Sequence, residues 1–218
     1  VPSDGFVVAS ESARDLLPAH ALNRRAHSAS ALAQFTACPY KFYLSAIMRL
    51  SEPERIAEVD ELDPRQRGSL FHAVQREIVN ALQANGLLPL TEADWPRARA
   101  LLHACLDAEL ARAREAYAPA IERVFDAALG SLRSDLEGWL RALCLDREWS
   151  PLYAELEFGF ENRRAAAPEP PNPRGAVLIE PGLLLSGAID LVEEHTDVLA
   201  SGQRMLRATD HKTGAVGA

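Results

Sequence analysis

The chain of 218 residues has few cysteines and no long apolar run. Its three cysteines, Cys38, Cys105 and Cys144, are widely spaced and form no Cys-x-x-Cys pair. This pattern argues against a disulfide framework and against a self-contained zinc site, and it fits a reducing compartment. No apolar segment is long enough to span a membrane and no signal peptide is visible, so we predict a cytoplasmic location and no membrane partner.

The chain also lacks the excess of basic charge that is typical of proteins that coat nucleic acid, because its formal net charge is −8. The acidic residues are unevenly placed, however. No Asp or Glu occurs from Leu16 to Ser51, a segment that contains Arg24, Arg25, Lys41 and Arg49. A carboxylate site for a metal ion also adds negative charge. The acidic balance therefore weakens the case for a nucleic-acid partner without excluding it.

The length suits one domain with a helical insertion. Residues 1–27 show no sustained period and are interpreted as a lead-in or linker. Residues 28–218 are predicted to form the domain, with a helical layer at 68–146 and a sheet at 152–214. The chain starts without Met and stops soon after residue 212, which indicates a piece of a longer protein that is truncated at its C-terminal end.

Helical patterns fill the first two thirds of the chain. Ser28 or Ser30 can cap a short helix, and Pro39 suits the first turn of a second one with an apolar face of Phe42, Tyr43, Ile47 and Leu50. A longer helix follows, with an apolar stripe made of Leu70, Phe71, Val74, Ile78 and Leu82. A capping box at Thr91–Asp94 and Pro119 open two more helices. His103, Cys105 and Cys144 in these helices are interpreted as core or surface residues.

Period-two patterns replace the helical ones after Trp149. Residues 152–161 predict one strand, residues 177–179 a second, and residues 183–195 and 205–214 a third and a fourth. The Pro-rich stretch 163–175 predicts a loop. Helical patterns in the first part of the chain are thus followed by strand patterns.

The last two strands carry the residues of greatest chemical interest. Asp210 and Lys212 lie two apart, so they are predicted to project from the same side of a strand while His211 points away. An antiparallel pairing would bring Asp190 beside them. Two carboxylates and an ammonium then suit a divalent metal and a water to be activated. Taken alone, Asp210 and Lys212 are better explained by a solvated strand face with an ordinary charge pair.

These motifs, taken in order, resemble the PD-(D/E)XK nuclease superfamily, and in particular its RecB-like branch with the nuclease domain of AddB-type helicase–nucleases. The family's Ser-x-Ser-x-Leu…Cys-Pro-x-x-Phe segment is matched by Ser28, Ser30, Leu32, Cys38, Pro39 and Phe42. Its Arg-Gly-x-x-x-His motif is matched at Arg67–His72, its Gly-x-x-Asp strand at Gly187–Asp190, and its Asp-x-Lys-Thr-Gly strand at Asp210–Gly214. Glu155, three residues before Phe158, matches a frequent Glu of the first core strand. The resemblance covers about residues 30 to 214.

The resemblance implies a restriction-endonuclease-like α/β (α+β) core with a large N-terminal helical portion, and a metal-dependent deoxyribonuclease activity. Asp190, Asp210, Lys212 and Glu155 would be catalytic. Mg²⁺ or Mn²⁺ would be held by His72, Asp190, Asp210 and the backbone carbonyl of His211. Arg67 and Lys41 would contact nucleic acid. The implied partners are DNA and a helicase domain or partner subunit, with a role in double-strand break repair or recombination, and the resemblance favours an exonuclease over an endonuclease.

The sequence departs from the family pattern in two places. The Gln-x-x-x-Tyr helix that usually follows the Lys strand is absent from residues 1–218. In AddB-like members a cysteine that matches Cys38 joins three later cysteines around a 4Fe-4S cluster, and those three are absent, so a cluster is expected only in a longer parent chain. The isolated fragment could therefore be inactive. Two alternatives stay open, namely an inactive DNA-binding or scaffolding module that kept the fold and a helical protein–protein module. For His72 and Glu155 the alternatives are a partly buried structural histidine and an exposed strand residue.

Overall fold

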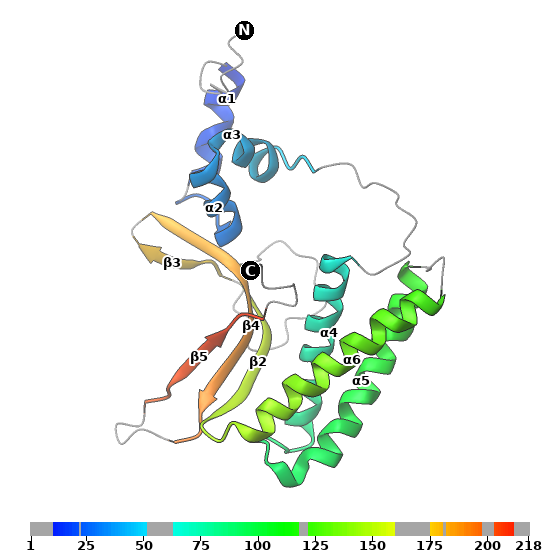
Figure 1. The fold of residues 1–218 in the computed structure, drawn as a ribbon. Helices are drawn as coiled ribbons and strands as arrows, with labels where there is room; N and C mark the ends of the chain where they lie inside the picture. Colours follow the sequence, from blue (N-terminus) through cyan, green and yellow to red (C-terminus); the bar gives the residue numbers. More distant parts are fainter. Residues whose placement is uncertain are drawn as a thin grey trace. The chain divides into compact units, whose positions relative to one another are not determined.

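The computed structural model describes residues 11–21, 23–51, 63–117, 122–159, 175–180, 182–197 and 203–211. The chain divides into two compact units, each made of two stretches of sequence (Figure 1). Unit 1 is Val1–Arg55 with Glu157–Ala188, and unit 2 is Ile56–Leu156 with Ile189–Ala218.

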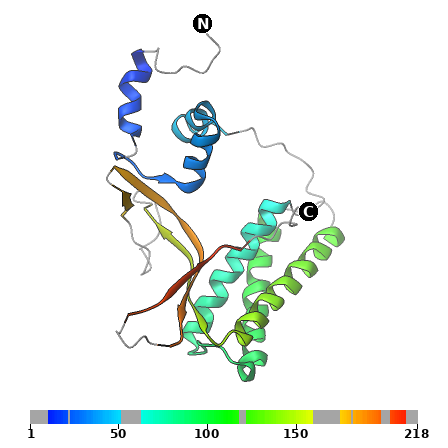
Figure 2. The same cartoon turned by 60° about the vertical axis from the view of Figure 1, so that its left-hand side comes forward.

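The sheet has five strands: β1 (His27–Ser28), β2 (Trp149–Phe158), β3 (Val177–Glu180), β4 (Leu183–His195) and β5 (Leu206–Thr209). The long strand β4 pairs with the four others, as the two views of the ribbon show (Figures 1 and 2). It runs parallel to β1 and antiparallel to β3 and β5. This mixed sheet with flanking helices confirms the predicted restriction-endonuclease-like α+β fold.

Unit 1 begins with short helices: α1 (Glu11–Leu16), the 3₁₀ turn η2 (Leu17–His20), α2 (Ala29–Ala37), α3 (Pro39–Phe42) and a π-helical turn η3 (Tyr43–Ile47). Helix α1, turn η2 and part of β1 lie within residues 1–27, where the sequence showed no period. Ser28 is the cap of α2, since its Oγ accepts from the amide of Ala31 at 3.2 Å. Phe42 is buried as predicted, but Leu50 is 59% exposed, because the chain leaves the helical path at Arg49 (φ 55°).

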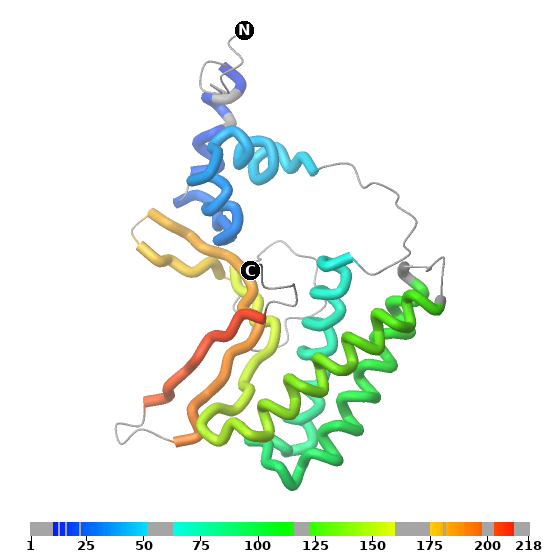
Figure 3. Tube along the Cα trace, in the orientation of Figure 1, coloured from blue at the N-terminus to red at the C-terminus, as the bar shows by residue number. Residues whose placement is uncertain are grey.

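Unit 2 holds the main hydrophobic core, between α4 (Pro64–Ala84), α5 (Trp95–Tyr117) and α6 (Glu122–Leu145), which the tube in Figure 3 follows. Asp63 and Gln66 form a capping box at the start of α4, and Thr91 and Asp94 form one at the 3₁₀ turn η4 (Glu92–Asp94). The predicted stripe of α4 is buried and packs against leucines of α5 and α6. The three long helices therefore form the core of unit 2 by packing against one another.

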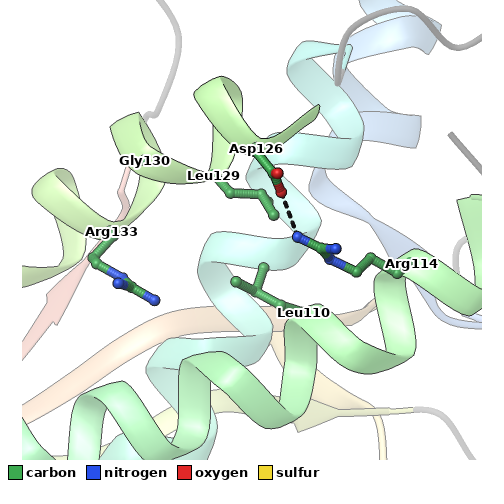
Figure 4. A pocket seen from close by; sticks show the side chains of 6 residues that line it. All are labelled: Leu110, Arg114, Asp126, Leu129, Gly130 and Arg133. Atoms are coloured by element: carbon green, nitrogen blue, oxygen red, sulfur yellow. Dashed lines mark hydrogen bonds and ion pairs between the residues drawn. The ribbon is translucent and has the colours of Figure 1, made fainter. Parts of the chain in front are cut away.

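A hollow of about 180 Å³ lies between α5 and α6 (Figure 4). It is lined by Leu110, Arg114, Asp126, Leu129, Gly130 and Arg133. Its one carboxylate, that of Asp126, is paired with the guanidinium of Arg114. The hollow therefore offers no set of metal-binding groups.

None of the described helices is long and apolar enough to cross a membrane.

Candidate metal centre

Three side chains from three elements of unit 2 converge: His72 of α4, Glu155 of β2 and Asp190 of β4. One ligand atom from each lies within 4.8 Å of the other two. All three residues are half-buried. One imidazole and two carboxylates at this spacing are a donor set that a divalent cation can bind.

Helix α4 presents His72 beside its buried stripe. His72 follows Phe71, whose side chain is buried in the helical core, so the imidazole projects from the edge of that face. Its Nδ1 lies 3.1 Å from Oε1 of Glu155, and its Nε2 lies 3.8 Å from Oδ2 of Asp190. The imidazole therefore lies between the two carboxylates.

Contacts between β2 and β4 show why the Gly187-x-x-Asp190 motif contains glycine. The amide of Thr196 donates to the carbonyl of Glu148 at 2.8 Å, and at the other end of the pair Gly159 lies against Ser186, so the two strands run antiparallel. A Cβ on Gly187 would lie 3.3 Å from Cζ of Phe158. The glycine thus makes room for the ring that follows Glu155 by three residues.

Glu155 itself has a φ of 53°, a left-handed conformation that is rare for a residue with a side chain. This conformation costs about 1–2 kcal/mol in a residue other than glycine. It also interrupts the regular alternation of side chains along β2, so strand periodicity alone does not decide where the Glu155 carboxylate points. Strain of this kind gathers at functional sites, where neighbouring structure holds it in place.

Strand β5 leads into Asp210 and His211. Its register with β4 pairs Leu191 with Thr209, so Asp210 follows the residue that stands opposite Leu191. The amide of His211 donates to Oδ2 of Asp190 at 2.9 Å. However, β5 ends at Thr209, and the prediction that Asp210 is itself a strand residue is wrong. Asp210 is exposed, and Lys212 lies outside the described residues.

The electrostatics of the two histidines at the site differ. The contact with Glu155 raises the pKa of His72, burial opposes this, and Asp190 and Asp210 add to the rise. The ring of His211 lies near Phe71 and Trp139, with centroids 6.3 Å from each, and burial lowers its pKa. The His72 imidazole therefore responds to the carboxylates, whereas the His211 ring behaves as a packed side chain.

A model of the PD-(D/E)XK nuclease superfamily matches residues 26–217 of the chain. The chain belongs to this superfamily. No curated protein matches it. PD-(D/E)XK nucleases use divalent metal ions, and the described part of this nuclease contains a histidine and two carboxylates whose chemistry fits one. The match supports the superfamily and leaves the RecB-like branch as a proposal.

Sequence reasoning missed a polar network that fixes β5 in this nuclease. The buried carboxylate of Glu193 receives two hydrogen bonds from its cross-strand partner Arg207, at 2.7 and 2.8 Å, and one from Thr209 at 2.8 Å. Arg207 also donates to Asp146 at 3.1 Å and stacks over Trp149 at 4.7 Å. A Glu and an Arg on adjacent predicted strands were the only sequence signal. The network orients the strand that leads into Asp210.

The remaining predicted residues are not among the three side chains that converge in the described part of the chain. Arg67 of α4 pairs with Asp135 of α6, so it ties two helices together in addition to any contact with nucleic acid. In unit 1, Lys41 is exposed, and its amide donates to Sγ of Cys38 at 3.5 Å. Cys38 is a free, exposed cysteine at the start of α3. Its role in an iron–sulfur cluster stays a prediction.

Proposed function

We propose that this chain is a divalent-metal-dependent deoxyribonuclease and that Asp190, Glu155 and His72 hold the metal ion, joined by Asp210 and the carbonyl of His211. The convergence of His72, Glu155 and Asp190 within 4.8 Å carries the proposal. Oxygen donors suit Mg²⁺, and the imidazole makes Mn²⁺ well tolerated. A bound divalent ion supplies Lewis acidity, which activates water and offsets the charge that develops on the phosphate.

The protein's own groups would each have one task. Asp190 is held in place by the amide of His211, so its second oxygen can face the ion. Glu155 is fixed by its left-handed backbone, and β5 is fixed by the Glu193–Arg207 pair. Lys212 would orient the attacking water or neutralise the scissile phosphate by its positive charge, on the strength of its place in the Asp-x-Lys motif.

We also propose a narrower role, which rests on the motif resemblance alone. The Ser28–Phe42 segment and the Arg67–His72 motif favour the RecB-like branch, and with it an exonuclease that works beside a helicase domain or subunit in DNA repair or recombination. A cytoplasmic location and a 4Fe-4S cluster at Cys38 in a longer parent chain belong to the same proposal.

Titration with Mn²⁺ tests the metal centre, followed by a nuclease assay on single- and double-stranded DNA with Mg²⁺, Mn²⁺ or chelator. Asp190→Asn should weaken Mn²⁺ binding and cleavage together. Asp197→Asn is the matched control, because Asp197 is exposed on the segment after β4 and away from the three ligands. Equal Mn²⁺ binding by the wild type and Asp190→Asn would refute the metal centre. Metal binding with intact DNA binding and no cleavage in the full-length parent would favour the inactive module instead.

A further inference from the structure

A second group of titratable side chains lies in unit 1, around the turn that joins η2 to β1. Nη1 of Arg25 lies 2.7 Å from Nδ1 of His20, and Nη2 of Arg25 donates to the carbonyl of Ala46 at 3.1 Å. Nε2 of His27 lies 3.2 Å from the carbonyl of His20. Burial lowers the pKa of both His20 and Arg25, the charge of Arg25 lowers that of His20 further, and the charge of Arg49 adds to both shifts, so Arg49 is counted with the group. His20, Arg25, His27 and Arg49 are called the cation cluster below.

The cation cluster has no compensating carboxylate among the described residues. In unit 2 several arginines of the helical layer are paired with acids, as Arg114 is with Asp126 in Figure 4 and Arg133 is with Asp107. In the cation cluster, Arg25 instead contacts a histidine and a carbonyl. Burial lowers the pKa of His20 and His27, so the charge of the cluster comes from Arg25 and Arg49, and two cations without acids leave a positive potential that attracts an anion. The segment 16–51 is positive in a chain whose net charge is −8.

A buried polar atom of the cation cluster also lacks a partner. His27 is only 2% exposed, and its Nδ1 makes no hydrogen bond within the described part of the chain. Burying a polar group without a partner costs free energy. Because Nε2 of His27 faces the carbonyl of His20 and the pKa of the ring is lowered by burial, Nδ1 is an acceptor that does not itself bind an anion, and the positive charge of the group comes from its arginines.

Exposed aromatic rings adjoin the cation cluster. The ring of His27 contacts Phe42 at a centroid distance of 5.6 Å, and Phe42 contacts Phe35 at 5.4 Å. Phe35 is 49% exposed and Tyr40, at the start of α3, is 48% exposed. A positive groove that follows a phosphate backbone, combined with aromatic rings on which unpaired bases stack, is how proteins bind single-stranded nucleic acid.

We propose that the cation cluster, with the exposed rings of Phe35 and Tyr40, binds single-stranded DNA. The arginines would hold phosphates, and the rings would stack on bases that are not paired in a duplex. The choice of DNA as the polyanion rests on the proposed nuclease function. The proposal goes beyond that function because it assigns binding of the strand to residues of unit 1 that take no part in holding the metal.

The test is binding of a fluorescent 20-nucleotide oligo(dT) to the full 218-residue chain in chelator, at several salt concentrations. Chelator keeps the measurement independent of cleavage, so a failed metal centre would not affect it. Arg49→Gln should flatten the dependence of log affinity on log salt by about 0.7, the contribution of one phosphate contact on a single strand. Arg49→Lys should restore the slope, since it keeps the charge. Arg25→Gln with Arg49→Gln should flatten it twice as much.

Two further variants separate stacking from charge. Phe35→Ala should weaken oligo(dT) binding about tenfold at every salt concentration, without changing the slope. Arg133→Gln, which removes an arginine that is paired with an acid in unit 2, should change neither the affinity for oligo(dT) nor its dependence on salt. A thermal melt checks the fold of each variant, and Arg49→Gln remains informative if Arg25→Gln unfolds, because the Arg49 side chain is exposed.

Three results would overturn the proposal. If Arg49→Gln left the slope of log affinity against log salt unchanged, Arg49 would make no phosphate contact. A duplex of the same length bound as tightly as oligo(dT), with no effect of Phe35→Ala, would show that the surface does not select single strands. Absence of DNA binding by a well-folded wild-type chain would leave the surface to a protein partner.

Discussion

His27 of unit 1 and His72 of unit 2 lie in opposite electrostatic surroundings. His27 is buried beside Arg25 and His20, and its pKa is lowered by burial and then by the charge of Arg25. His72 lies between Glu155 and Asp190, and its pKa is raised by the Glu155 contact. The net charge of −8 hides this separation. One region of the chain suits a polyanion and the other suits a cation, so strand binding and metal-dependent chemistry are assigned to different residues.

Residues with a left-handed backbone conformation occur in both of these regions. Among the described residues other than glycine, only Arg49 and Glu155 have a positive φ, at 55° and 53°. One belongs to the cation cluster and the other to the candidate metal centre. Each of the two regions thus keeps a strained backbone position at a charged side chain that we propose to be functional.

The largest expected effect is on the kinetics of cleavage, where variants of the two regions should change different constants. Asp190→Asn should lower kcat for DNA cleavage by about 10²–10³-fold, because it removes a group that acts on the charge developing in the transition state. Arg49→Gln should raise KM and leave kcat unchanged, because it removes binding that is uniform along the reaction. Steady-state cleavage of oligo(dT) in Mg²⁺ measures both. A fall in kcat of similar size in both variants would show that the division of labour is wrong.

Two lysines with different predicted roles, Lys212 of the Asp-x-Lys motif and Lys41 of unit 1, offer a second way to distinguish chemistry from DNA binding. Lys212→Ala in the full-length parent should lower turnover by about 10²-fold while DNA binding and thermal stability hold, since loss of a transition-state charge acts on the chemical step. Lys41→Ala should instead weaken strand binding a few-fold with turnover intact, because Lys41 is exposed within the acid-free segment. Chelator-resistant cleavage that survives in a folded Lys212→Ala protein contradicts the role of Lys212.

Because His27 is buried, we expect the stability of unit 1 to depend on pH. Its folded pKa is below the ordinary value of 6.5, so above that pH both the folded and the unfolded histidine are neutral and stability does not change. As pH falls below 6.5 the unfolded state binds the proton first, and stability is lost. The protection factors of amides in residues 27–47 should therefore fall between pH 7 and 5.5, and His27→Gln should flatten that trend. A protection factor that is independent of pH in the wild type would contradict the link between His27 protonation and the stability of unit 1.

The smallest expected effect concerns the strained backbone. At Glu155, the Gly variant should be more stable than the Ala variant by about 1 kcal/mol, the reverse of the usual order in a strand, because glycine adopts a positive φ without steric cost. Arg49 should show the same reversed order. Glu157, in the same strand with an ordinary φ, is the matched control and should favour Ala. Urea unfolding of the six variants measures the differences, and Ala favoured at all three positions would exclude strain.

Much of the fold could be predicted from local patterns. The bounds of β4, Leu183–His195, follow from its apolar run and the glycines around it, and the buried face of α4 follows from its helical spacing. His72, Glu155 and Asp190 could be named only through their motifs. Their convergence depends on the packing of α4 against two strands, and no local pattern contains that information.

Other features depended on contacts between distant segments. The end of β5 at Thr209 could not be read from residues 205–214, whose apolar and turn residues predicted a longer strand. The Glu193–Arg207 pair requires the register of β4 and β5, and the cation cluster requires the turn that brings Arg25 to His20 and Ala46. The sequence showed the missing acids of segment 16–51 but not which of its cations gather.

The most direct test of the central claim is paramagnetic broadening of the histidine ring signals by Mn²⁺ in solution NMR. The chain has six histidines, and each reports on its own neighbourhood. On addition of substoichiometric Mn²⁺, the signals of His72 should broaden strongly. Asp190→Asn should abolish the effect and Asp197→Asn should leave it intact. A His72 signal that stays sharp in the wild type, or that broadens equally in Asp190→Asn, would contradict a metal centre formed by His72, Glu155 and Asp190.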